Sequence, residues 1–195
     1  MNVSNTVAKP AVFLDRDGVV VESRRAPGEP APPASVDDAT VLEGVAATLD
    51  AFRAAGFSLV VVTNQPDVAR GHMSRSDVDA INEWISSVLP IDATYVCFHD
   101  GTACNCRKPR PGMLFNAARD LDLDLRPSWM IGDRWVDIAA GAAAGVRTVL
   151  IKRTYSWRAT SSGVKPPLIS LPTMSPDGFW KRPSSSWRQP RRLGD

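Results

Sequence analysis

The feature that most constrains the fold is an apolar run at residues 11–14 that stops abruptly at Asp15-Arg16-Asp17-Gly18. The run has the length and composition of a short buried strand. In an open parallel sheet, reactive groups lie just beyond the carboxyl ends of the strands, so both aspartates are expected to project into one crevice while Gly18 lets the chain turn away. Two close carboxylates repel each other unless a cation or a shared proton relieves them. The alternative is a solvated acidic turn without a reactive role. The residues in the rest of the chain distinguish between these two interpretations.

The same arrangement recurs along the chain. Four further runs of strand character lie at residues 57–62, 95–98, 129–131 and 146–151. Apolar residues at helical spacing predict helices over residues 43–55, after an N-cap at Ser74 or Ser76, from Pro111 onward, and over residues 137–144. Strands that alternate with helices predict a parallel sheet in one layered α/β domain. Residues 24–36 are rich in proline and are predicted to form an irregular loop.

The chain of 195 residues is long enough for one domain with a sizeable core. We predict that residues 1–155 form this domain. Residues 156–195 contain six prolines and many serines and arginines without periodicity, which is typical of a disordered, basic tail. Residues 1–151 contain 14 basic and 19 acidic residues, and this acidic balance disfavours nucleic acid as a partner.

The compartment is predicted from hydropathy and cysteine usage. No apolar run approaches the roughly 20 residues of a membrane span, and no signal-peptide pattern precedes residue 11. All three cysteines fall between residues 97 and 106, which is too local for a disulfide framework. We therefore expect a cytoplasmic monomer without a membrane partner.

Polar groups at the strand ends predict a phosphoryl-transfer site. Magnesium prefers oxygen ligands, which suits the carboxylates of Asp15 and Asp133 and a backbone carbonyl near Asp17. An aspartate can attack phosphorus when a metal and fixed donors, here Thr63 and Lys108, neutralise the phosphoryl oxygens. A second carboxyl group, Asp17, is close enough to protonate the leaving oxygen and later to activate water.

A second constellation consists of three thiols and an imidazole on one short loop: Cys97, His99, Cys104 and Cys106. Four such ligands match a tetrahedral structural zinc site, which leaves no open catalytic position. Incidental thiols are the alternative, but every cysteine and one of only two histidines gather here. Zinc would hold Arg107 and Lys108 directly behind the loop.

Taken together, these residues resemble the four ordered motifs of the haloacid dehalogenase-like phosphatases: Asp15-Arg-Asp-Gly18, Thr63-Asn-Gln65, Arg107-Lys-Pro109 and Gly132-Asp133-x-x-x-Asp137. The resemblance implies a Rossmann-like three-layer α/β/α fold without a large cap domain, and a bound Mg²⁺. It also implies Asp15 as nucleophile, Asp17 as general acid and base, and Thr63 and Lys108 as holders of the transferring phosphoryl group.

The zinc loop before Arg-Lys-Pro narrows the resemblance to two branches of this family, the D-glycero-D-manno-heptose 1,7-bisphosphate phosphatases and the histidinol-phosphatase domains. Both branches act on small phosphorylated metabolites. Residues 69–71 and 108–113 look more like the heptose branch, and this is the preferred interpretation, with the 7-phosphate as the target. The four-residue spacer between His99 and Cys104 is closer to the histidinol branch, and residues 21–26 depart from the usual pattern of both.

Further residues are candidates for contacts with the substrate or the metal. The candidates for substrate binding are Asn64, Gln65, Pro66 and Arg107, the last by bidentate contact with an anion. Three other arginines, Arg24, Arg25 and Arg70, are interpreted as solvated surface charge ahead of a second phosphate site. Asp137 is expected either to orient the metal ligands or to cap a helix. A nucleic-acid end-phosphatase and a non-catalytic, zinc-stabilised binding module remain as alternative functions.

Overall fold

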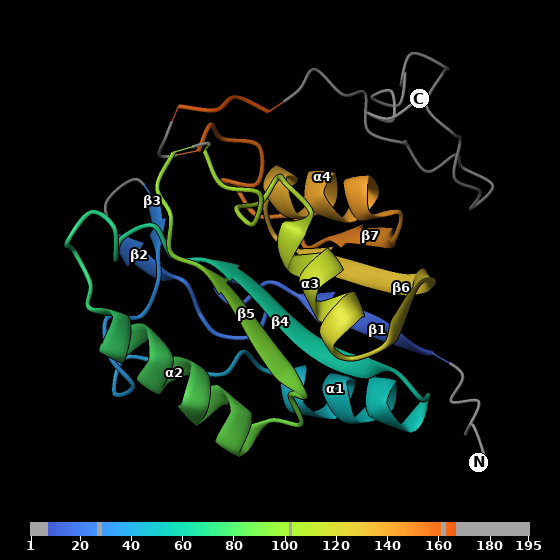
Figure 1. Ribbon diagram of the computed structural model, residues 1–195. Coiled ribbons are helices and arrows are strands. Elements are labelled where there is room, and N and C mark those ends of the chain that lie inside the picture. The colour runs from blue at the N-terminus through green and yellow to red at the C-terminus, as the bar shows by residue number, and fades with distance from the viewer. Residues whose placement is uncertain (1–7, 27–28, 102, 161–162, 167–195) are drawn as a thin grey trace, which may run out of the picture.

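The fold is built on a five-stranded parallel sheet (Figure 1). The computed structural model describes residues 8–26, 29–101, 103–160 and 163–166. In spatial order, the strands are β5 (Ala93–Cys97), β4 (Ser58–Asn64), β1 (Lys9–Leu14), β6 (Leu123–Gly132) and β7 (Arg147–Leu150). Each of the five predicted strands is present, so the α/β prediction is confirmed.

Helices cover both faces of this sheet, which gives three layers (Figure 1). The helices are α1 (Val45–Ala54), α2 (Arg75–Val88), α3 (Gly112–Asp120) and α4 (Trp135–Ala144). Helices α1 and α2 lie on one face, and α3 and α4 lie on the other. All four helices predicted from apolar spacing are present. Among the described residues, no helix is long and apolar enough to cross a membrane.

The central strand β1 is buried on both faces because both layers pack on it. Val12 and Leu14 point into the cluster beneath α1 and α2, and Phe13 points into the cluster beneath α3 and α4. Side chains that alternate across a strand explain this division. The almost continuous apolar run at residues 11–14 is therefore the signature of a strand covered on both sides.

Local sequence signals fix the start of α2. Ser74 is its N-cap: the Ser74 hydroxyl accepts from the Asp77 amide at 3.1 Å, and the Asp77 carboxylate accepts from the Ser74 amide at 3.3 Å. This reciprocal pair satisfies two amides that have no partner within the helix. Of the two serines that could cap the helix, the structure therefore selects Ser74.

The prediction of an irregular loop at residues 24–36 is wrong. Within it, β2 (Arg24–Ala26) and β3 (Glu29–Ala31) pair as an antiparallel two-stranded sheet. The prolines concealed this hairpin, because proline cannot donate to a ladder and is found mainly on edge strands. The hairpin lies beside the carboxyl end of the main sheet, and the residues that flank it contribute to the cavity described below.

Residues after β7 continue to pack on the domain. Ser156 is fully buried, and its carbonyl accepts from the Trp135 amide at 2.9 Å. The predicted tail at 156–195 thus begins with residues that contact α4. The parts of it at 161–162 and 167–195 lie outside the described residues.

Candidate active site

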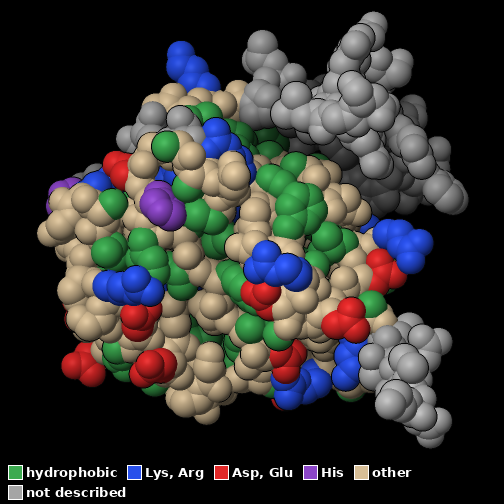
Figure 2. All heavy atoms as spheres, viewed as in Figure 1, with side chains coloured by type: hydrophobic (Ala, Val, Ile, Leu, Met, Phe, Trp, Pro, Cys, Tyr) green, Lys and Arg blue, Asp and Glu red, His purple; other side chains and the backbone are tan. Residues whose placement is uncertain are grey.

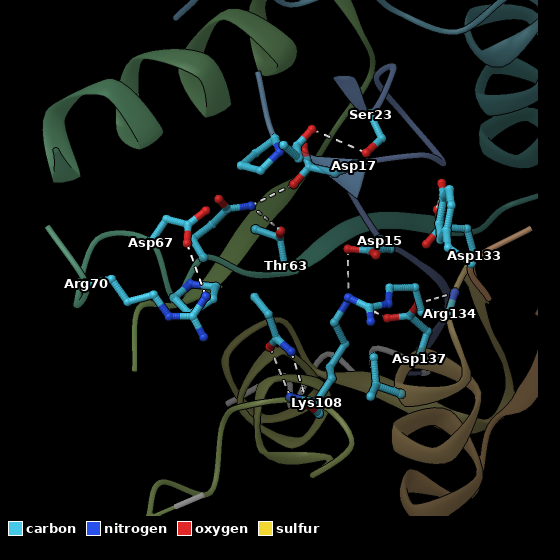
Figure 3. Close-up of a pocket in the computed structure, with 17 residues that line it drawn as sticks. Asp15, Asp17, Ser23, Thr63, Asp67, Arg70, Lys108, Asp133, Arg134 and Asp137 are labelled. Carbon is cyan, nitrogen blue, oxygen red and sulfur yellow. Dashed lines mark hydrogen bonds and ion pairs between the residues drawn. The ribbon is translucent and has the colours of Figure 1, made fainter. Parts of the chain in front are cut away.

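A cavity of about 250 Å³ opens at the carboxyl ends of β1, β4 and β6 (Figure 3). Parallel strands deliver the residues that follow them to the same edge of the sheet, so motifs far apart in the sequence meet there. The cavity is lined by Asp15, Asp17, Ser23, Ala31, Pro32, Thr63, Asn64, Gln65, Pro66, Asp67, Arg70, Lys108, Asp133, Arg134, Val136, Asp137 and Tyr155. The structure therefore brings together the predicted site residues from all four motifs.

Lys108 is the cation at the centre of the cluster (Figure 3). Its ammonium lies 2.8 Å from Asp15 Oδ1 and 2.6 Å from Asp137 Oδ1, and it donates to the Val62 carbonyl at 2.8 Å. Burial would lower the pKa of Lys108, but the charges of Asp137 and Asp15 outweigh burial and raise it above its ordinary value. Lys108 is therefore a fixed positive charge inside the site.

Asp15 is held in place by backbone as well as by Lys108. Its amide donates to the Ile131 carbonyl at 2.9 Å, and its Oδ1 accepts from the Arg16 amide at 2.8 Å. Both the Arg16 amide and Lys108 contact Oδ1. The other carboxylate oxygen, Oδ2, is thereby left as the atom that suits attack on a substrate.

The carboxylates of Asp15, Asp133 and Asp137 form a cluster whose oxygens lie within 4.8 Å of one another. Burial, followed by the charge of Asp15, raises the pKa of Asp133 to about 7. The same two causes raise the pKa of Asp137 to about 6, against the opposing effect of Lys108. The buried Asp133 Oδ1 has no hydrogen-bond partner among the described residues. A hard cation with oxygen ligands fits this concentration of negative charge.

Asp17 is held from two sides. Arg16, which is fully buried, donates from Nε to Oδ1 at 3.1 Å and from its terminal nitrogen to Oδ2 at 3.2 Å. Gln65 Nε2 donates to Asp17 Oδ2 at 2.7 Å and to Thr63 Oγ1 at 3.0 Å. Asn82 on α2 accepts from the remaining Arg16 nitrogen at 2.9 Å. The carboxylate of Asp17 is therefore positioned by a chain of contacts that starts in the helix layer.

Asn64 fastens the loop that carries Lys108. Its Nδ2 donates to the Lys108 carbonyl, and its Oδ1 accepts from the Lys108 amide, both at 3.0 Å. These two bonds join the end of β4 to the loop before α3. Asn64, Gln65 and Pro66 were predicted to bind substrate, and all three line the cavity. The side-chain amides of Asn64 and Gln65, however, form hydrogen bonds with Lys108 and Asp17.

Of the arginines, Arg107 was predicted to bind a substrate anion, whereas Arg24, Arg25 and Arg70 were interpreted as solvated surface charge. Arg107 is buried, donates to the His99 carbonyl at 2.8 Å and is not among the residues that line the cavity. Arg70 lines the cavity, but it pairs with Asp100 at 2.8 Å and with Asp67 at 3.3 Å. The side chains of Arg24 and Arg25 lie outside what the structure describes.

Several lining residues were not found by sequence reasoning. Ser23, Ala31 and Pro32 come from the chain around the β2–β3 hairpin, and Arg134 and Tyr155 come from the turn before α4 and the segment after β7. Arg134 is adjacent to Asp133, so its place in the motif was an available signal. Ser23 lies in the segment 21–26 that departs from the pattern of both branches, which was also a signal, whereas Ala31, Pro32 and Tyr155 have no local pattern that indicates a site.

The cysteines and one histidine converge at the end of β5 and on the loop that follows it. Their ligand atoms, Cys97 Sγ, His99 Nδ1, Cys104 Sγ and Cys106 Sγ, lie within 4.8 Å of one another. Zinc–sulfur bonds of about 2.3 Å in a tetrahedron place sulfurs roughly 3.7 Å apart. The Sγ atoms of Cys97 and Cys104 lie 3.7 Å apart, and those of Cys97 and Cys106 lie 3.2 Å apart. The donor set and its spacing fit a four-coordinate zinc ion.

The chain is similar to a known protein family and to characterised phosphatases. A family profile described as HAD-hydrolase-like matches residues 105–164. The chain is 35% identical over 158 residues to the D-glycero-beta-D-manno-heptose-1,7-bisphosphate 7-phosphatase of Escherichia coli K12. This alignment covers 74% of this chain and 80% of that protein. It is 36% identical to the protein of the same name from Photorhabdus laumondii, over 74% of this chain and 81% of the relative.

Solved structures agree with the sequence relatives. The D,D-heptose 1,7-bisphosphate phosphatase from B. bronchiseptica, crystallised with magnesium and phosphate, superposes with a TM-score of 0.62. Its sequence identity is 31%, and the match covers 72% of this chain and 79% of that one.

Proposed function

The chain belongs to the haloacid dehalogenase-like phosphatases, in the family of the D-glycero-β-D-manno-heptose-1,7-bisphosphate 7-phosphatases, and we propose that it removes the 7-phosphate of that heptose bisphosphate through an aspartyl-phosphate. It is a phosphoric monoester hydrolase with an α/β fold of that family. The observation that carries the assignment of residues is the buried cluster in which Lys108 pairs with Asp15 and Asp137 beside Asp133.

In the first step, Asp15 Oδ2 attacks phosphorus and the bond to the substrate oxygen breaks. Asp17 donates its proton to that leaving oxygen, so the sugar departs with a neutral 7-hydroxyl group and keeps its 1-phosphate. Lys108 neutralises charge on the phosphoryl oxygens, and Thr63 donates a hydrogen bond to them. In the second step, Asp17 takes a proton from water, which attacks phosphorus and restores the Asp15 carboxylate as inorganic phosphate leaves.

The residues that would hold Mg²⁺ are Asp15, Asp133 and the Asp17 backbone carbonyl, with Asp137 beside them. When bound, this ion supplies charge neutralisation at the phosphoryl group. The solved relative that contains magnesium and phosphate supports the choice of ion. We further propose structural zinc on Cys97, His99, Cys104 and Cys106, where thiolate ligation requires reduced cysteines, as in the cytoplasm.

A small substrate suits the size and charge of the site. The cavity has a volume of about 250 Å³, which suits a small phosphorylated metabolite. Figure 2 shows acidic and basic side chains interspersed on the face in view. Residues 1–151 contain more acidic than basic residues, whereas an enzyme acting on nucleic-acid ends usually has a basic face around its site. Histidinol phosphate remains the second candidate, because the four-residue spacer between His99 and Cys104 resembles that branch.

The test measures phosphate release from heptose 1,7-bisphosphate and histidinol phosphate with the wild-type chain, Asp15→Asn and Asp50→Asn. Asp50 is an exposed residue of α1 and serves as the matched control. We expect Asp15→Asn to lose about 10³-fold or more in kcat, since the nucleophile is removed, and Asp50→Asn to match the wild type. Faster turnover of histidinol phosphate would overturn the heptose assignment, and an active Asp15→Asn would revive the non-catalytic binding module.

A further inference from the structure

The segment that follows β7 returns across the sheet edge to the active site. The Trp135 amide donates to the Ser156 carbonyl and Trp135 Nε1 donates to the Arg158 carbonyl, each at 2.9 Å. Arg153 donates to the Gly18 carbonyl at 3.2 Å, and its own amide donates to Ser156 Oγ at 2.8 Å. The segment is thus anchored both to the start of α4 and to the turn after β1.

Tyr155 lies between these anchors, and its hydroxyl donates to Asp133 Oδ2 at 2.5 Å. Burial, followed by the neighbouring Asp133, raises the pKa of Tyr155 above its ordinary value, so the hydroxyl keeps the proton that it donates. The two oxygens of Asp133 therefore differ: Oδ2 has a donor, and the buried Oδ1 has no hydrogen-bond partner within the described residues.

Gly18 provides the space for this contact. A Cβ atom at Gly18 would lie 2.0 Å from Asp133 Oδ2 and 2.9 Å from the Tyr155 hydroxyl, so a side chain there would displace one or both of these groups. The backbone there also has a φ of +86°, which favours glycine. The turn after Asp17, the Asp133 carboxylate and the Tyr155 hydroxyl therefore pack as one unit.

We propose that Tyr155 is a positioning residue for the magnesium site: by holding Oδ2 of Asp133, it fixes the carboxylate so that Oδ1 is presented to the cation. This inference rests on the proposed function, in which Asp133 binds Mg²⁺. A carboxylate without this donor could rotate about its terminal bond, and the cation would then have to order it on binding. Outer partners of metal ligands typically contribute 10- to 100-fold in metal affinity.

The experiment compares wild type, Tyr155→Phe and Tyr95→Phe by isothermal titration calorimetry with MgCl2. Tyr95 is the only other tyrosine of the chain, and its hydroxyl also contacts a carboxylate, Asp120 at 3.1 Å, in an exposed position away from the cavity. We expect the Mg²⁺ dissociation constant of Tyr155→Phe to rise about 10-fold and that of Tyr95→Phe to stay at the wild-type value. Thermal midpoints without Mg²⁺ report separately on folding.

Excess Mg²⁺ provides a second readout. If Tyr155 acts through Asp133, saturating MgCl2 should restore the kcat of Tyr155→Phe to within about two-fold of wild type, because the lost affinity is recovered by mass action. An unchanged dissociation constant for Tyr155→Phe, in a wild-type protein that binds Mg²⁺ and releases phosphate, would overturn this inference and leave the proposed function intact. A wild-type chain that binds no Mg²⁺ would overturn both.

Discussion

Asp133 and Asp137 are buried carboxyl groups, and their raised pKa values make the free energy of unfolding depend on pH. The pKa of Asp133 is raised to about 7 and that of Asp137 to about 6, with burial as the first cause in each case. In the unfolded chain both groups have an ordinary pKa near 4. Between these values the folded state binds more protons than the unfolded state, so the free energy of unfolding decreases as pH rises.

We therefore predict that, without Mg²⁺, the thermal midpoint falls by several degrees from about pH 5 to about pH 8. The stability is fully present below the unfolded pKa and is lost as pH rises through the folded pKa values of about 6 and about 7. Saturating MgCl2 should raise the midpoint most at the upper end of this range, where the carboxylates are ionised. Differential scanning fluorimetry across pH, with and without MgCl2, measures both effects.

Asp133→Asn is the control for this pH dependence, because the amide does not titrate. Its midpoint should change less with pH than that of the wild type, and MgCl2 should stabilise it less. A variant with the full wild-type slope would assign the effect to other groups, such as Asp137.

For individual residues, the sequence predicted which side chains belong to the site better than it predicted the contacts that those side chains make. Asp15, Lys108 and Asp133 were predicted to share a site because their residue types at strand ends suit phosphoryl transfer, and the structure places them in one cavity. The contacts of Asn64 with Lys108 could not be predicted, because they depend on how a later loop docks on β4. Tyr155 lay outside every motif, and only the return of the chain to Asp133 reveals its contact.

Among the elements, the loop that carries the Cys/His cluster packs on the core through Cys97, Cys104 and Cys106, and a bound metal would tie these residues together. Arg107 from the next motif donates to the His99 carbonyl, so the cluster and the loop that carries Lys108 are physically joined. Displacement of the cluster would then be transmitted to Lys108.

We predict that His99→Asn binds less zinc, unfolds at a temperature several degrees lower and loses about 10-fold or more in kcat. His72→Asn is the matched control, because the chain has only two histidines and the His72 side chain is 71% exposed. Inductively coupled plasma mass spectrometry gives the zinc content, and phosphate release gives kcat. Full zinc content with wild-type activity in His99→Asn would contradict the proposed zinc site.

The elements themselves were largely predictable because the parallel sheet is covered on both faces. Continuous apolar runs identified the strands, and spaced apolar positions identified the helices. The β2–β3 hairpin was missed because it is short and proline-rich, so neither periodicity nor composition indicates strands. The first part of β6 was also missed: residues 123–128 contain Asp124, Arg126 and Pro127, and only pairing with β1 makes them a strand.

For the whole molecule, the contacts of the segment after β7 bear on where the phosphatase domain ends. The predicted boundary after residue 155 cuts between Tyr155 and its anchors, Ser156 and Arg158. Residues up to Val164 continue this segment through hydrogen bonds with Thr160. The described contacts therefore favour a boundary after this segment.

We predict that a chain ending at Pro166 keeps kcat within about two-fold of the full chain, whereas a chain ending at Lys152 loses Mg²⁺ affinity by about 10-fold or more. The shorter chain lacks the Tyr155 hydroxyl and the contacts of Ser156 with α4. Calorimetric titration with MgCl2 and phosphate release compare the two truncations. Equal affinity in both would show that the segment after β7 is dispensable for metal binding.

The path of the chain through the sheet also affects how the enzyme matures during synthesis. Asp15 leaves the ribosome early, at the end of the strand that becomes the centre of the sheet, whereas Lys108, Asp133 and Tyr155 follow in that order. Because the N-terminal part of a domain is made first, a partial chain that lacks these later residues holds only part of the site. The site is thus incomplete in a nascent chain until Lys108 and Asp133 have been made and the strands that precede and follow them have joined the sheet.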